Sequence, residues 1–116
     1  MTLGDFYAAV GGDIKTVLQR IPSEAMVKKF VLKYPADPTC AELDSSIAAG
    51  DWDTAFRAAH TLKGVSQNLG FEELYRVSFE LTEALRGGKA LQDKSLHEAV
   101  RAENARVIAA IEALDK

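Results

Sequence analysis

Apolar residues along this chain recur at spacings of three and four positions, which is the period of an amphipathic helix. β-Branched residues are dispersed, and no segment alternates cleanly between apolar and polar positions, so strand signals are weak. The pattern predicts short helical pieces at 1–21, interrupted at Gly11-Gly12. It then predicts longer helices at 22–34, 37–50, 52–69, 71–87 and 95–114.

Turn and cap residues set the ends of these predicted helices. Pro22 can open its helix, because the missing N–H of a proline costs little at a first helical position, and Pro35 stops that helix. Gly50 is placed to end the next helix, and Asp51 to cap the one after it. Gly70 is predicted to end the helix at 52–69, which Asp51 caps.

Each predicted helix carries one apolar stripe, which a helical bundle can bury. Between the two prolines this apolar face consists of Met26, Val27, Phe30, Val31 and Tyr34. Short connections favour antiparallel neighbours. We therefore predict an all-α fold, an antiparallel four-helix bundle at 22–115 with additional short N-terminal helical segments at 1–21, in one domain over 1–116.

Composition and charge exclude several classes of function. The net charge is −3 and the basic residues are scattered, so no nucleic-acid partner is predicted. Cys40 is the only cysteine, which excludes an intramolecular disulfide and argues against a zinc site. No apolar run approaches the roughly 20 residues that span a bilayer, and the N-terminus lacks the features of a secretory signal. We expect a cytoplasmic protein without a membrane partner.

The helix predicted at 52–69 carries unusual residues on its outward face. On a helical wheel, its buried stripe contains Ala55, Ala59, Leu62, Ser66 and Leu69. His60 points almost directly away from that stripe. Lys63, Gly64 and Gln67 follow at i+3, i+4 and i+7, so they are predicted to share this face, with Phe56 at its edge.

These residue types suit the transfer of a phosphoryl group. Gly64 costs a helix about 1 kcal/mol relative to alanine, so an exposed glycine here suggests that another molecule must come close. The positive charge of Lys63 disfavours a protonated imidazole at His60, and a neutral ring has the lone pair that attack on phosphorus requires. The ammonium can then neutralise phosphoryl oxygens, and the Gln67 amide can orient the ring or the phosphoryl group.

A run of residues around His60 resembles the signature of histidine phosphotransfer (HPt) domains. The run reads Ala-His-Thr-Leu-Lys-Gly at 59–64, followed by Asn-Leu-Gly at 68–70. The flanking stretches Ala-Ala-Gly-Asp-Trp at 48–52 and Phe-Glu-Glu-Leu at 71–74 are also similar to the family, and the resemblance covers roughly 22–114. One departure is Val65, where the family more often has a smaller residue. On the wheel Val65 faces the bundle, so it affects packing rather than chemistry.

The resemblance implies a carrier rather than an enzyme, with no kinase activity of its own. His60 would accept a phosphoryl group through Nε2 from the aspartate of one receiver domain and donate it to another. Lys63 would steady the phosphoryl charge, Gly64 would leave clearance for the receiver, and Gln67 would hydrogen-bond near the imidazole. The chain would need no cofactor, because Mg²⁺ is expected on the partner receiver domain.

The partners expected from the resemblance are response-regulator receiver domains and a hybrid sensor histidine kinase, bound by a monomer. Docking is predicted to use Phe56, Gly64, Lys29 and Lys33 around His60. Three alternatives stay open: a phosphoacceptor domain of a chemotaxis-type histidine kinase, a receiver-binding module that carries no phosphate, and a plain structural bundle.

The second histidine, His97, is predicted to be a surface or edge residue without a catalytic role. It precedes a glutamate, but position 101 is arginine, so the His-Glu-x-x-His pattern of zinc proteases is not present. The stretch also lacks the proline that follows the reactive histidine in kinase dimerisation helices.

Overall fold

The computed structural model describes residues 1–115, which fold into seven α-helices and one 3₁₀ turn without any strand. The prediction of an all-helical fold is confirmed. In chain order the elements are α1 (Leu3–Ala9), α2 (Ile14–Leu18), α3 (Glu24–Lys33), the 3₁₀ turn η1 (Tyr34–Ala36), α4 (Thr39–Ala49), α5 (Trp52–Leu69), α6 (Glu72–Leu85) and α7 (Ser95–Asp115).

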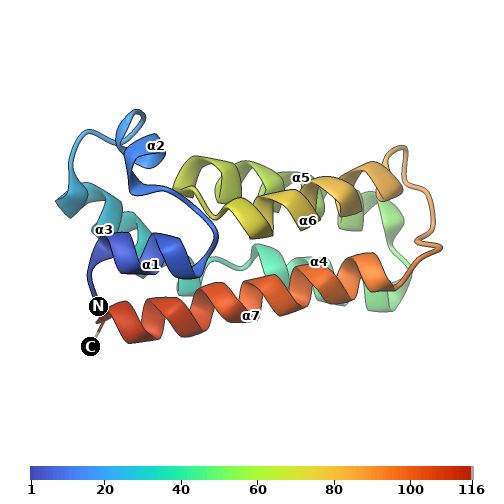
Figure 1. Ribbon diagram of the computed structural model, residues 1–116. Coiled ribbons are helices and arrows are strands. Elements are labelled where there is room, and N and C mark those ends of the chain that lie inside the picture. The colour runs from blue at the N-terminus through green and yellow to red at the C-terminus, as the bar shows by residue number, and fades with distance from the viewer. Residues whose placement is uncertain (116) are drawn as a thin grey trace.

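The four long helices α4 to α7 form the body of the molecule, and α5 packs extensively against both α4 and α6. Figure 1 shows α5 and α6 together in one layer and α4 with α7 in the other. A hydrogen bond joins α4 to α7, between His97 Nε2 and Asp44 Oδ1 at 2.6 Å. The His97 side chain is 15% exposed and lies between α4 and α7, which agrees with the edge position among the two predicted for it.

The ends of α5 are set by the residues predicted to set them. The Asp51 carboxylate accepts hydrogen bonds from the backbone N–H and the hydroxyl of Thr54, which caps the N-terminus. Gly50 and Gly70 have φ values of 70° and 75°, the left-handed conformation in which a chain leaves a helix most easily at glycine. These local signals fix both the length of α5 and the register of its faces.

The N-terminal helices hold the C-terminal end of α5. Tyr7 of α1 donates a hydrogen bond from its hydroxyl to the Leu69 carbonyl at 2.6 Å, and Arg20 donates to the Gln67 carbonyl at 2.8 Å. The last carbonyls of a helix lack their usual helical partners. The Tyr7 hydroxyl provides one for Leu69, and Arg20 adds a second bond to the Gln67 carbonyl, which also accepts from the Gly70 N–H. Burial raises the pKa of the Tyr7 phenol, which keeps it a donor.

The helix α3 differs from its prediction in two respects. It begins at Glu24 rather than at Pro22, because the Ser23 hydroxyl accepts a hydrogen bond from the Met26 N–H and so provides the cap. Met26 and Phe30, which were predicted to belong to its apolar face, are 42% and 39% exposed. Phe30 shares a groove with Val65 and Leu69 of α5, which leaves part of its ring exposed.

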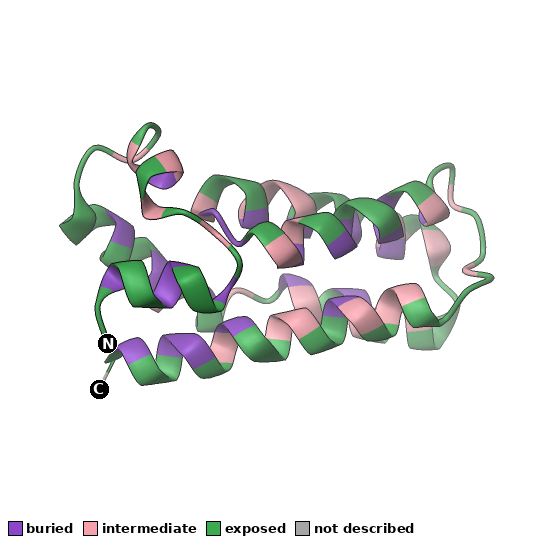
Figure 2. Ribbon diagram, in the orientation of Figure 1, coloured by how far each residue is buried: buried purple, intermediate pink, exposed green. Residues whose placement is uncertain are grey.

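One continuous core lies between the layers, with the buried positions of each helix turned toward it (Figure 2). On α5 the inward positions are small, which allows α4 and α6 to approach closely. The buried residues of α5 are Ala55, Ala58, Ala59, Leu62 and Ser66.

Candidate functional site

His60 lies exposed near the middle of α5, on the side opposite the core. Its neighbour Ala59 and the residue Leu62 are fully buried, so the helix cannot rotate the ring inward without exposing them. Among residues 1–115, no hydrogen bond involves either ring nitrogen of His60. The imidazole is therefore available to a partner, as the helical wheel predicted.

Gly64 leaves open space one turn beyond His60. A Cβ atom built at this position would meet no atom within 4 Å beyond its chain neighbours and the adjacent backbone of its own helix. The residue is helical and does not have a positive φ, so its backbone conformation does not require glycine. The predicted gap beside the imidazole is present, and the packing of the protein does not account for it.

Neither Lys63 nor Gln67 forms a hydrogen bond with the His60 ring in the described part of the chain. Lys63 is half-buried, and its Nζ atom lies 5.3 Å from the centre of the Phe79 ring of α6. The Gln67 side chain is exposed, and in the described part of the chain its amide forms no hydrogen bond with the imidazole. On a wheel Lys63 lies about 60° from His60 toward α6, which explains why its ammonium meets that helix first.

One turn before His60, the ring of Phe56 lies next to the imidazole, and the guanidinium of Arg86 lies next to that ring. The rings of Phe56 and His60 are 6.0 Å apart and tilted by 45°, and the guanidinium of Arg86 lies 5.4 Å from the Phe56 ring centre. Glu83 accepts a hydrogen bond from Arg86 at 2.6 Å. That bond holds the pKa of the Glu83 carboxyl below its usual value, and the positive charges of Arg86 and Lys63 act in the same direction.

Two arginines at the site were not predicted. Arg57 and Arg86 line a shallow hollow together with Phe56, His60 and Thr61, so two guanidinium groups border the imidazole. Arg57 could have been found, because it lies three positions before His60 on the same helix. Arg86 belongs to the end of α6, and no periodicity within α5 could reveal it.

The predicted docking lysines separate into one close to α5 and one farther away. Lys33 lines a groove with Phe30 of α3 and with Val65, Asn68 and Leu69 of α5. Lys29 is exposed on α3 but does not line that groove. The structure thus brings Lys33, but not Lys29, next to the helix that carries His60.

The described residues offer neither a metal centre nor a membrane anchor. Within residues 1–115, no three His, Cys, Asp or Glu side chains gather where they could hold a metal ion. No helix in this range combines the length and the apolar character that crossing a bilayer would require.

Fold and site together define a class: small helical proteins that present one solvent-facing histidine, beside a gap, from the middle of a rigid helix. A family model described as Hpt domain matches residues 35–115, from η1 through α7. No curated protein and no solved structure matches the chain closely enough to serve as a relative. The chain belongs to the Hpt domain family and is a histidine phosphotransfer module of the kind that interacts with receiver domains in phosphorelays.

Proposed function

We propose that His60 is the phosphoacceptor and that the protein carries a phosphoryl group between the aspartates of receiver domains, without kinase activity of its own. The observation that carries this proposal is the imidazole itself. It is exposed on a helix whose register is fixed by the core, with open space at Gly64 beside it. A nucleophile that must meet a residue of another protein has to be both accessible and rigidly placed.

In the proposed step, Nε2 of His60 attacks the phosphorus of a receiver's aspartyl phosphate. An N–P bond forms as the O–P bond breaks, and the aspartate leaves as a carboxylate with the bonding electron pair. The attacking ring must be neutral, with its proton on Nδ1, because Nε2 then holds the free lone pair. The reverse step returns the phosphoryl group to a second receiver. The receiver would contribute the Mg²⁺.

Cations around the hollow support this role. Arg57 and Arg86 border the imidazole, and Lys63 lies one turn away on the α6 side of α5. A phosphoryl group on Nε2 brings oxygens with up to two negative charges, which guanidinium and ammonium groups stabilise. Gln67 is exposed on the same side of the helix and would reach the phosphoryl group only after its side chain reorients.

The receiver is proposed to dock over the His60 face of α5, in contact with Gly64, and to reach Phe56 on the α6 side and α3 on the other side. Met26 and Phe30 are large apolar side chains that the fold leaves 42% and 39% exposed, and Lys33 lies beside them. An apolar centre with a charged rim is the usual anatomy of a protein interface. Lys29, on the exposed side of α3, would belong to that rim.

The test is to incubate the protein with a phosphorylated receiver and to look for label that is labile in acid and stable in alkali. We expect the label on the wild-type protein and its loss in His60→Ala. The matched control is His97→Gln, which removes the second histidine and should keep the label. Label that persists in His60→Ala would overturn the assignment of the site.

A further inference from the structure

The ammonium of Lys63 is held by an aromatic ring from the neighbouring helix. Its Nζ lies 5.3 Å from the centre of the Phe79 ring, within the range of a cation–π interaction. We propose that Phe79 is a positioning residue for phosphoryl transfer, which holds the Lys63 ammonium beside the site until a phosphoryl group arrives at His60. This inference rests on the proposed function of His60.

The exposure of Phe79 is otherwise unexplained by the fold. The side chain is 42% exposed, and it lies outside the buried stripe of α6, which contains Leu74, Val77, Leu81 and Leu85. Tyr75, one turn earlier, lies with its ring centre 6.3 Å from that of Phe79 and limits the freedom of the ring. The Phe79 ring is thus partly exposed to solvent and contacts the Lys63 ammonium.

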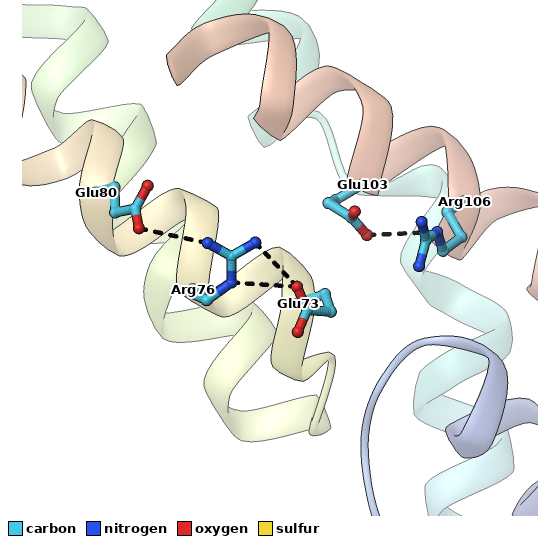
Figure 3. Close-up of polar contacts among 5 residues, drawn as sticks. All are labelled: Glu73, Arg76, Glu80, Glu103 and Arg106. Atoms are coloured by element: carbon cyan, nitrogen blue, oxygen red, sulfur yellow. Dashed lines mark hydrogen bonds and ion pairs between the residues drawn. The ribbon is translucent and has the colours of Figure 1, made fainter. Parts of the chain in front are cut away.

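The two arginines at positions 76 and 86, in α6 and directly after it, are held by carboxylates. Arg76 pairs with Glu73 at 3.0 Å and with Glu80 at 3.4 Å, as Figure 3 shows, and Arg86 pairs with Glu83 at 2.6 Å. In the described part of the chain, none of the ion pairs includes Lys63. The charge of Lys63 still acts on the Glu83 carboxylate, but that carboxylate is hydrogen-bonded to Arg86, and the direct contact of the Lys63 ammonium is with the Phe79 ring.

A ring is a suitable temporary partner for this ammonium. A lysine side chain free in solvent samples many rotamers, and that freedom is lost whenever it engages a ligand. Contact with Phe79 removes part of this freedom beforehand and holds the charge on the α6 side of the helix that carries His60. A cation–π contact is weaker than a charge-assisted hydrogen bond to a phosphoryl oxygen, so the arriving group can draw the ammonium away.

The test uses phosphoramidate, a small donor that phosphorylates histidine without a receiver and therefore without a docking surface. We expect Phe79→Leu to slow labelling of His60 by about threefold, and Phe79→Tyr, which keeps the ring, to restore the wild-type rate. In a Lys63→Gln background, Phe79→Leu should have no further effect, because the ring acts only through the lysine.

A spectroscopic readout separates positioning from a general effect on the fold. NMR should show the Lys63 ε-methylene protons shifted upfield by the Phe79 ring in the free protein, and this shift should disappear in Phe79→Leu and after phosphorylation of His60. Unchanged labelling in Phe79→Leu, or equal slowing with and without Lys63, would overturn the positioning role. Absence of any label on His60 in the wild-type protein would overturn the proposed function as well.

Discussion

At Gly64 the backbone is helical, and a methyl group added there would meet no atom within 4 Å beyond the neighbouring backbone of α5. Alanine is favoured over glycine inside a helix by about 1 kcal/mol, because glycine loses more freedom on folding. We therefore expect Gly64→Ala to raise the free energy of unfolding by up to about 1 kcal/mol in urea denaturation. The same change should slow phosphoryl transfer from a receiver, since it narrows the gap beside His60.

A matched variant calibrates that measurement. Ala102 lies exposed on α7, away from the site, so Ala102→Gly should lower the free energy of unfolding by about 1 kcal/mol and leave transfer unchanged. A Gly64→Ala protein that is less stable than wild type would show that the glycine has a structural role after all.

At the scale of single elements, α5 depends on the N-terminal helices for the hydrogen bonds of its last turn. Tyr7→Phe keeps the buried ring and removes only the bond to the Leu69 carbonyl. We expect this change to lower the free energy of unfolding by about 1 kcal/mol, because the carbonyl loses its buried partner. Urea denaturation tests it. The control is Tyr75→Phe, on a partly exposed tyrosine, which should shift stability by less than about 0.5 kcal/mol.

The elements that could be predicted from the sequence are those whose signals are local. The bounds of α5 agree with the prediction, because Asp51 and Gly70 cap the helix from within a few residues. The apolar face of α3 could not be assigned correctly. Periodicity identifies which residues share a face, but the exposure of Met26 and Phe30 depends on how far the rest of the fold covers that face.

The same limit applies to the site. The position of His60 and the gap at Gly64 follow from one helical wheel, which is why both were predicted. The contacts of Lys63 with Phe79, and of Phe56 with Arg86, join α5 to α6. They depend on how two helices are packed, and that relation is set by the whole core rather than by either segment.

At the scale of the whole molecule, α3 and α6, which both border the exposed part of α5, differ in charge. The helix α3 contains three lysines and one glutamate, whereas α6 contains four glutamates and one arginine. An approaching receiver therefore meets a basic flank on one side of His60 and an acidic flank on the other. Such a field orients a charged partner and mainly affects the rate of association.

Charge reversal on α3 tests the docking side. We expect Lys33→Glu to lower the second-order rate constant of transfer from a receiver by about threefold at low salt, and less as salt screens the charge. Lys28→Glu is the control, because Lys28 lies about 160° around α3 from Phe30 and its reversal should have little effect. Stopped-flow transfer assays distinguish the two. If both reversals had equal effects, the cause would be the overall charge of the protein rather than a docking contact at Lys33.

Within residues 1–115, no hydrogen bond fixes the imidazole of His60. This freedom affects the phosphoryl-transfer potential of the phosphorylated ring. A histidine whose second nitrogen is gripped by a carboxylate becomes a stronger base and binds its ligand more firmly. Here no carboxylate of residues 1–115 holds the second nitrogen, so any stabilisation of a phosphoryl group would come from the cations that border the ring. Without a carboxylate on the second nitrogen, the phosphoryl group would keep a high transfer potential. The direction of its transfer would then depend on which receiver domain binds.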